Sequence, residues 1–223
     1  MIYISGLVGF LLVLTAEARI GNSSESEFCT ETKQCLLYDL VCEHEEYEVR
    51  HYDSVKWVST EEKSYFMEKA TMTAFRRLFA YITGANENGE KIDMTAPVLV
   101  KVEKKKKIWD SCVYTMSFLL PAEHQQNPPK PTDDMVHIHD MPDMKVYVRH
   151  YGGWMMSFVD KMNAQLLTWQ LDTAGAQYNQ DYHYAVGYDS PMKLFNRHNE
   201  VWYVVEGEPV CPANAVTEPL PSA

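Results

Sequence analysis

A repeated tetrapeptide constrains the fold of this chain more than any other feature of its sequence. Val-Arg-His-Tyr stands at residues 49–52 and again at residues 148–151. Each copy opens a series of four segments, which are an alternating polar and apolar stretch typical of a strand, a stretch with helical periodicity, and two further strand-like stretches. The shared order, more than the four shared letters, indicates a duplicated β-α-β-β unit.

The first half is predicted to contain a strand, a helix and a hairpin of two strands. The elements predicted for this half, residues 47–120, are a strand at 47–58, a helix at 61–84, a strand at 91–102 and a strand at 108–120. In the first strand, Tyr47, Val49 and His51 fall on the side that is expected to face a core. Arg50 and Tyr52 fall on the opposite side.

The second half repeats this order after a proline-rich link at residues 121–134. The elements predicted for this half, residues 135–206, are a strand at 144–153, a helix at 154–175 and strands at 182–190 and 199–206. The helix face expected to pack inward carries Met155, Phe158, Met162, Leu166 and Trp169. Neither half can bury its own sheet face, so we expect the two halves to pack around one core, which predicts the α+β class.

Three residues mark predicted boundaries of these elements. Gly84 and Gly175 each follow a helical pattern and are expected to end the two helices. Pro97 interrupts an apolar strand pattern, which indicates an edge strand or a bulge because proline cannot donate a hydrogen bond to a neighbouring strand.

The N-terminal residues predict export. Residues 1–18 contain an apolar run and end in a small-residue pattern, which is typical of a secretory signal peptide cleaved after Ala18. An uncleaved anchor is the alternative, because neither Lys nor Arg precedes the run. Asn22 begins a glycosylation sequon, which is consistent with a secreted, extracellular glycoprotein.

The cysteines also fit an oxidising compartment, where disulfide bonds are their expected use. They are Cys29, Cys35, Cys42, Cys112 and Cys211. The first three lie in an N-terminal arm, residues 19–46, and the last lies in a tail, residues 207–223, that is expected to be flexible apart from any bridge. An odd number leaves one thiol over, and the pairing stays open.

The charge of the chain argues against two classes of partner. Twenty Lys and Arg face thirty-one Asp and Glu, which gives a net charge of −11 at pH 7. Such an acidic field repels phosphate backbones and anionic lipid surfaces, so we expect neither nucleic acid binding nor membrane insertion.

Histidines provide the candidate ligand atoms. His51 and His150 occupy the same place in the two repeats, where an imidazole near apolar neighbours can ligate haem iron or another metal. The alternative for both is a histidine bonded to a backbone carbonyl at the edge of the core. His137, His139 and Asp140 place two imidazoles on one face of an extended segment, either as part of a metal site or as a solvated strand face.

Other residues suggest a site for a large planar ligand. Twelve methionines and an aromatic content of 12% can line such a site, although an ordinary core uses the same residues. Lys104–Lys107 can meet ligand carboxylates from a rim, or can form a solvated hairpin tip. Cys211-Pro212 resembles a short haem-coordinating element, but an exported cysteine is expected to be oxidised. The sequence contains no nucleophile elbow, phosphate-binding glycine loop or paired-carboxylate signature, so no reaction is predicted.

Three blocks of sequence resemble the SOUL haem-binding protein family, and within it the haem-binding protein 2 branch. They are YEVRHYDSVKWVST, KIDMTAPV and GYDSPMKLFNRHNEVWYV, in this order between Tyr47 and Glu206. The resemblance implies that residues 47–206 form a distorted antiparallel β-barrel of two β-α-β-β halves, flanked by two helices and similar to effector-binding domains.

The resemblance also implies a non-enzymatic protein that binds haem b or other porphyrins non-covalently in an apolar groove. In this branch the histidine of YEVRHY is the proposed axial iron ligand, which here is His51, and His150 has no implied role. The best-known members lack a signal peptide, so their intracellular roles do not transfer. The alternatives are a carrier of other amphipathic small molecules, and a metal-dependent enzyme that uses His137, His139 and Asp140.

Overall fold

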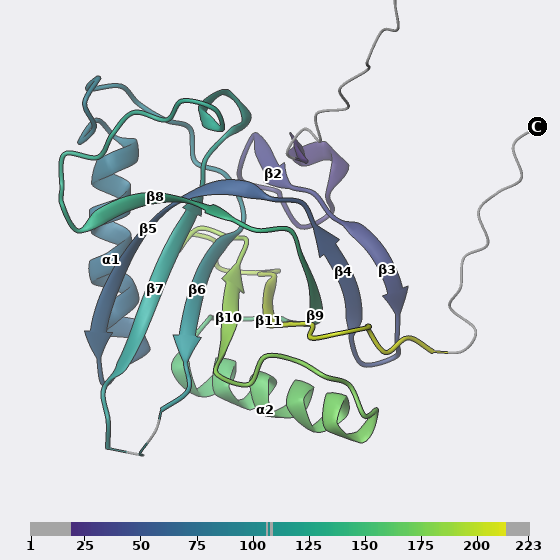
Figure 1. Cartoon of the computed structure of the whole chain (residues 1–223). Helices are drawn as coiled ribbons and strands as arrows, with labels where there is room; N and C mark the ends of the chain where they lie inside the picture. The colour runs from purple at the N-terminus through teal and green to yellow at the C-terminus, as the bar shows by residue number, and fades with distance from the viewer. Residues whose placement is uncertain (1–18, 106, 108, 213–223) are drawn as a thin grey trace, which may run out of the picture.

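The computed structural model describes residues 19–105, 107 and 109–212 (Figure 1). The predicted signal peptide, residues 1–18, and residues 213–223 of the predicted tail lie outside this part of the chain. The helices are α1 (Met67–Ile82) and α2 (Ser157–Thr173). The strands are β1 (Ile20–Asn22), β2 (Gln34–Leu36), β3 (Asp39–Glu43), β4 (Glu48–Tyr52), β5 (Val55–Ser64), β6 (Val98–Glu103), β7 (Cys112–Leu119), β8 (Val136–Met141), β9 (Met144–Tyr151), β10 (Tyr182–Gly187) and β11 (Asn199–Val204).

Two bent strands close the main sheet into a barrel. This antiparallel sheet has the order β3-β4-β9-β11-β10-β6-β7-β5-β8. Tyr52 of β4 pairs with Met144 of β9. Beyond a two-residue bend in each strand, Val55 of β5 pairs with Met141 of β8 in the same register. Because β4–β5 and β8–β9 form one continuous ladder, the pairings make a closed ring, and the predicted α+β class with a distorted barrel is confirmed.

The two copies of the tetrapeptide lie side by side in this ladder, on β4 and β9. Val49 pairs with Tyr147, and Glu48 pairs with Val148. Val49 in the first repeat is equivalent to Val148 in the second, and Glu48 is equivalent to Tyr147. When each residue is replaced by its equivalent, the pair Val49–Tyr147 becomes the pair Val148–Glu48, as expected for two repeats related by a two-fold axis. Each half has the predicted β-α-β-β order, with its first strand bent into two segments.

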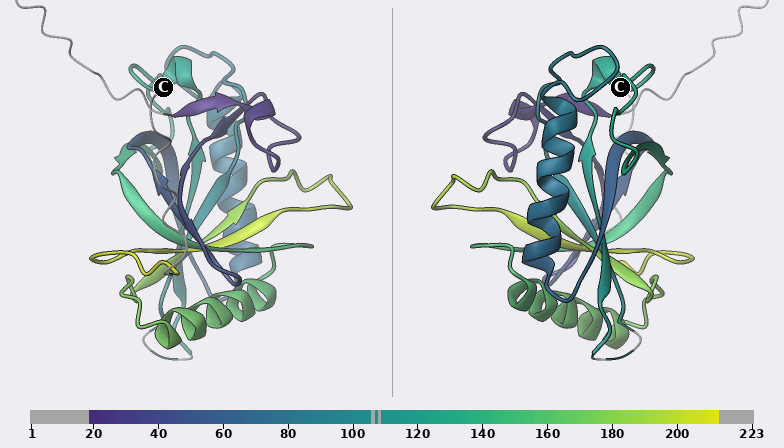
Figure 2. Two further views of the ribbon diagram at one scale, coloured as in Figure 1. Left: turned by 90° about the vertical axis from the view of Figure 1, so that its right-hand side faces the viewer. Right: turned by 90° about the vertical axis from the view of Figure 1, so that its left-hand side faces the viewer.

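The two helices lie on the outside of the barrel (Figure 2). α1 packs against β5 and β7, whereas α2 packs against β9 and β11. Gly84 and Gly175 follow these helices with φ of 125° and 69°, a region that favours glycine, so both predicted helix ends are confirmed. Inside the barrel, Trp57, Trp202 and Leu99 are fully buried in one apolar cluster.

The interior also holds a buried ion pair. We predicted Arg50 and Tyr52 on the outer side of their strand, but both are buried. Arg50 Nη1 lies 2.9 Å from Glu200 Oε1, and both side chains are fully buried. Tyr188 and Trp202 donate hydrogen bonds to Glu200 Oε2. The prediction was wrong because this strand is covered on both faces, and because a partner from β11 neutralises the charge of Arg50.

The helix face predicted to be buried in the second half is also wrong. The residues of α2 that pack inward are Asp160, Asn163, Ala164, Leu167 and Leu171. The residues of the predicted face that are exposed are Phe158, Met162, Leu166 and Trp169. α2 carries apolar residues on both sides, so helical periodicity could not decide which side meets the sheet.

The expectation that Pro97 marks an edge strand or a bulge is wrong as well. β6 pairs with β10 on one side and with β7 on the other, so it lies inside the sheet. Pro97 stands immediately before β6, after a cis peptide bond with Ala96. At that position its missing N–H group removes no hydrogen bond from either ladder.

Two disulfides are present, one within the N-terminal arm and one that joins β3 to the segment after β11. Cys29 is bonded to Cys35, and Cys42 is bonded to Cys211, which leaves Cys112 as a free cysteine. The N-terminal arm contributes β3 to the main sheet, and it contributes Cys29, Cys35 and Leu36 to the apolar cluster inside the barrel. The arm is therefore integrated into the fold.

We expect Glu200→Gln to destabilise the fold by about 3–5 kcal/mol, because it leaves the Arg50 guanidinium buried without a counter-charge. Burial alone would raise the pKa of Glu200, but the charge of Arg50 and hydrogen bonds from His198 and Trp202 lower it to about 2. The stability that this carboxylate contributes is therefore present above its ordinary pKa of 4.5 and is lost as the pH falls toward 2. Urea unfolding at several pH values should show that loss in the wild type and a flatter profile in the variant.

The double variant Arg50→Met with Glu200→Leu is the matched control. It removes both charges and replaces them with apolar side chains, so it should cost less stability than Glu200→Gln alone. Equal unfolding free energies for the wild type and Glu200→Gln at neutral pH would contradict the importance of this ion pair.

Candidate functional site

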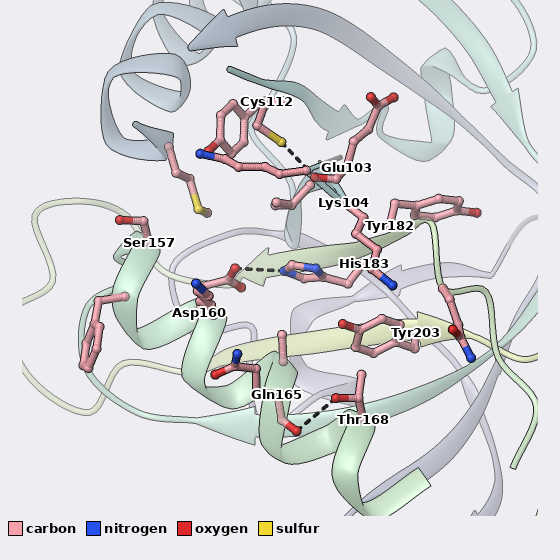
Figure 3. A pocket seen from close by; sticks show the side chains of 18 of the residues that line it. Glu103, Lys104, Cys112, Ser157, Asp160, Gln165, Thr168, Tyr182, His183 and Tyr203 are labelled. Atoms are coloured by element: carbon pink, nitrogen blue, oxygen red, sulfur yellow. Dashed lines mark hydrogen bonds and ion pairs between the residues drawn. The ribbon is translucent and has the colours of Figure 1, made fainter. Parts of the chain in front are cut away.

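A large pocket opens on the outside of the barrel, between α2 and the hairpin that joins β6 to β7 (Figure 3). Its volume is about 850 Å³, which is within the usual range for small-molecule sites. Val102 of β6, Tyr114 of β7 and His183 of β10 form part of its floor. They face outward because alternate residues of these strands, such as Tyr184 beside His183, fill the barrel.

Five tyrosines contribute to the lining of this pocket. They are Tyr65, Tyr114, Tyr178, Tyr182 and Tyr203. Met67, Phe158 and Ala164 add apolar surface. Burial raises the pKa of both Tyr114 and Tyr178 to about 12, so their hydroxyl groups are neutral at physiological pH. The pocket therefore offers flat apolar surfaces edged with hydroxyl groups, which suit a planar aromatic ligand.

His183 and Asp160 form a polar pair within the pocket (Figure 3). His183 Nε2 lies 2.8 Å from Asp160 Oδ2, and the Asp160 side chain is only 3% exposed. A neutral His183 that donates its Nε2 proton to this carboxylate presents an unprotonated Nδ1, which is a ligand atom. Oδ1 of Asp160 is buried and has no hydrogen-bond partner in the described part of the chain.

Four exposed lysines stand around the pocket, on two opposite walls. Lys104, Lys105 and Lys107 come from the β6–β7 hairpin, and Lys161 comes from α2. We expected the hairpin lysines to lie at the rim of a ligand site, and these three line the pocket, whereas Lys106 lies outside the described residues. Carboxylates of a ligand that enters the pocket would meet ammonium groups on both sides.

We did not predict His183, Asp160 or Cys112 as site residues. Cys112 lies in the pocket, where its thiol donates to the Glu103 carbonyl oxygen at 2.9 Å and where burial raises its pKa. Asp160 was missed because the wrong face of its helix was assigned to the interior. Two features of the sequence could have indicated this site. His183 lies in an otherwise apolar strand, and Asp160 lies on a helix that was expected to pack against a sheet.

His51, the candidate iron ligand, lies elsewhere. It is half-buried on the outer face of β4, and it is not among the residues that line the large pocket. Its Nε2 is 2.7 Å from Asp143 Oδ2, and its Nδ1 is 3.8 Å from Asp39 Oδ2. Ligand atoms of His51, Asp53 and Asp143 lie within 4.8 Å of one another, so this group could hold a metal ion.

The other candidates from the sequence are not brought into the large pocket. His150 is exposed on β9. On β8, His139 approaches Ser59, and Asp140 forms an ion pair with Lys56 at 2.6 Å. Within the described part of the chain, His137, His139 and Asp140 do not bring three ligand atoms together as the His51 group does.

Cys211, which precedes a proline in a sequence that resembles a haem-coordinating element, is bonded to Cys42. Its sulfur is therefore not available to iron, as expected for an oxidised cysteine. Within the described residues, neither helix has the length and the apolar character that are needed to cross a bilayer.

Comparison with a solved structure supports the fold. The C-terminal domain of EcmrR aligns with a TM-score of 0.56 at 10% sequence identity, and the alignment covers 77% of this chain and 99% of that domain. At this level of identity the likeness concerns the arrangement of helices and strands and carries no statement about ligands.

Comparison with known sequences shows the family. The model of the family described as SOUL heme-binding protein matches residues 33–204. Heme-binding protein 2 of Homo sapiens is 41% identical over 165 residues, which cover 73% of this chain and 80% of that protein. Heme-binding protein 1 of Bos taurus is 31% identical over 170 residues, which cover 73% of this chain and 84% of that protein. These names point to a binding protein rather than an enzyme, and the chain belongs to the SOUL heme-binding protein family.

Proposed function

We propose that this protein binds haem and related tetrapyrroles in the pocket between α2 and the β6–β7 hairpin. The observation that carries the proposal is that one pocket combines tyrosine surfaces, lysines on opposite walls and the His183–Asp160 pair. A porphyrin has two flat apolar faces, carboxylates at one edge, and a centre that holds nitrogens and, in haem, iron. Each of these features has a counterpart in the lining.

Apolar contact supplies most of the affinity in this proposal. Burying roughly 400 Å² of porphyrin surface at about 25 cal/mol per Å² gives about 10 kcal/mol, before the costs of ordering the ligand and the side chains are subtracted. The lysines then orient the ligand through its carboxylates, and an iron ligand adds selectivity for haem over metal-free porphyrin.

Two histidines are proposed as the iron ligand, and they belong to different surfaces. The family resemblance implies His51, which must release Asp143 before its Nε2 can bind iron. The pocket itself contains His183, whose Nδ1 is left for a ligand when Nε2 donates to Asp160. A haem that occupies the pocket has His183 in its surroundings and not His51.

A haem titration of histidine variants distinguishes these two positions. We expect the wild type to give a shifted Soret band that saturates near 1:1. We expect His183→Ala to lose the ligated spectrum, and His51→Ala and His150→Ala to keep it, because only His183 lines the pocket. Loss of the spectrum in His51→Ala alone would place the iron at His51, and an unshifted spectrum with the wild type would contradict haem binding.

A second candidate function is a carrier of amphipathic small molecules. Comparing the affinity for metal-free protoporphyrin with the affinity for haem tests it. The pocket favours this candidate in one respect, since the tyrosines and lysines recognise flat shape and negative charge without using iron. Equal affinities for haem and for metal-free porphyrin would support the carrier, whereas a clear preference for haem would support iron ligation.

Neutralising the hairpin lysines tests how the ligand is oriented. Lys104→Gln, Lys105→Gln and Lys107→Gln together should weaken binding of protoporphyrin by roughly 2- to 30-fold, because its two carboxylates can form two exposed ion pairs that contribute about 0.2–1 kcal/mol each. Binding of its dimethyl ester, which lacks the two carboxylates, should change little. Equilibrium titration by tyrosine and tryptophan fluorescence measures both ligands.

A triple variant of remote lysines is the matched control for charge. Lys91, Lys130 and Lys145 are exposed, and none of them lines the pocket. Their replacement by Gln changes the net charge by the same amount and should leave both affinities unchanged. Equal weakening by the two triple variants would show that the hairpin lysines act only through the overall charge.

We also propose that the protein is secreted as a glycoprotein after cleavage at Ala18. The two disulfides support an oxidising destination, and Asn22 of the sequon is exposed. Protein collected from the medium of expressing cells should begin at Arg19, as measured by N-terminal sequencing. A loss of mass after glycosidase treatment, absent in Asn22→Gln, checks the glycan, and retention of the uncleaved chain inside the cells would contradict secretion.

A further inference from the structure

The end of the molecule that carries the pocket also carries an exposed apolar helix face. The residues of this face, here called the α2 stripe, are Phe158, Met162, Leu166 and Trp169. Phe158 is 77% exposed and Trp169 is 67% exposed, although both are large apolar side chains. They recur at helical spacing on the side of α2 that points away from the sheet, because the opposite side holds Leu167 and Leu171 in the core.

The β6–β7 hairpin reaches the same end of the molecule. Figure 1 shows that the end of β6 and the start of β7, which border this hairpin, lie at the lower end of the barrel near α2, and both views of Figure 2 place α2 at this end. Trp109 in this hairpin is 73% exposed, and Lys104, Lys105 and Lys107 are exposed beside it. Lys107 Nζ lies 6.0 Å from the centre of the Trp109 ring. A surface that touches Trp109 and these three lysines can therefore also touch the α2 stripe.

We propose that this end of the protein docks on an anionic lipid surface, with the pocket mouth toward the bilayer. Exposed tryptophan and phenylalanine side chains enter the headgroup region of a bilayer, and neighbouring lysines pair with anionic headgroups. The hairpin and α2 supply both kinds of residue, and both also line the pocket. The protein lies on the surface in this arrangement and does not span it.

The charges at this end favour lipid over a second copy of the chain. The net charge of −11 opposes the approach of the whole molecule to an anionic surface. The described lining of the pocket, however, carries four lysines against three acidic residues, and one of these, Asp160, is buried beside His183. A two-fold dimer through the same face would bring one set of lysines against the other, which costs free energy, whereas anionic headgroups complement them.

The docked arrangement gives the pocket a direct path to the bilayer. A flat amphipathic ligand that is dissolved in lipid could enter between the hairpin and α2 without crossing water. This consequence rests on the proposed function, whereas docking itself does not, because the ligand-free protein presents the same surface.

Vesicle binding of the ligand-free chain from Arg19 onward tests the proposal. Flotation with vesicles of phosphatidylcholine containing 30% phosphatidylserine should recover the wild type, and pure phosphatidylcholine or high salt should reduce recovery. Met162→Ser with Trp169→Ser should lower the partition coefficient at least tenfold. Neither residue lines the pocket, so haem titration of this variant should match the wild type.

Leu194→Ser with Phe195→Ser is the matched control. These two residues are 66% and 79% exposed in the β10–β11 loop, and neither lines the pocket, so their replacement removes similar apolar surface from another place. The control should bind vesicles like the wild type. Absence of vesicle binding by the wild type, or equal losses in both double variants, would overturn the proposal.

Sedimentation velocity tests the alternative that a second copy of the chain, and not a lipid surface, covers the α2 stripe. A dimer of the wild type that dissociates in Met162→Ser with Trp169→Ser, without vesicle binding, would make the α2 stripe an interface between copies and would also overturn lipid docking. Vesicle binding without any haem or porphyrin binding would leave the docking surface in place and would remove the proposed function.

Discussion

The continuous ladder between β4–β5 and β8–β9 is the constraint on which the rest of the structure depends. Because both strands keep one register through their bends, the sheet closes and acquires an inside and an outside. The inside must be filled, which Trp57, Trp202 and the Arg50–Glu200 pair achieve. Everything that can meet a ligand or a partner is left to the outside, where each half of the duplicated chain contributes one helix.

The pocket follows from this division of the outer surface. α1 covers β5 and β7, and α2 covers β9 and β11, so the paired strands β6 and β10 lie between the two helices. Val102 and His183, which are opposite each other in that pair, both face the pocket. The scaffold is symmetric but the site is not, because the first half supplies the lysine hairpin and the second half supplies His183 and Asp160. The pocket thus lies on a surface shared by the two repeats, and each repeat contributes different side chains to it.

The sequence predicted the order of elements and the C-terminal ends of the two helices, because these depend on local signals such as Gly84, Gly175 and the repeated strand pattern. The closed barrel was implied by the family resemblance, and the start of the first helix was predicted too early because residues 61–64 extend β5. The sequence did not predict which sides of β4 and α2 face inward. Arg50 is buried only because Glu200, distant in the chain, supplies the opposite charge, and no local pattern reports such a partner. α2 is apolar on two sides, so its packing face is decided by the fit of Ala164 and Leu167 to the sheet. His183 and Asp160 were missed for the same reason, since the two side chains pair only after β10 and α2 come together in the fold.

In the proposed function, the separation of His51 from the pocket divides recognition of a tetrapyrrole into two parts. The first part is recognition of shape and charge, which the proposal assigns to tyrosines and lysines that do not depend on a metal. The second part is selectivity for iron, which the proposal assigns to His183, the one histidine among the described lining residues, because its hydrogen bond with Asp160 orients the ring. Under this proposal, a chain that lost the His183–Asp160 pair would keep the tyrosines and lysines of the pocket and would still bind metal-free porphyrin. The proposal therefore places carriage and iron selectivity on different residues of one pocket, so that they can change independently.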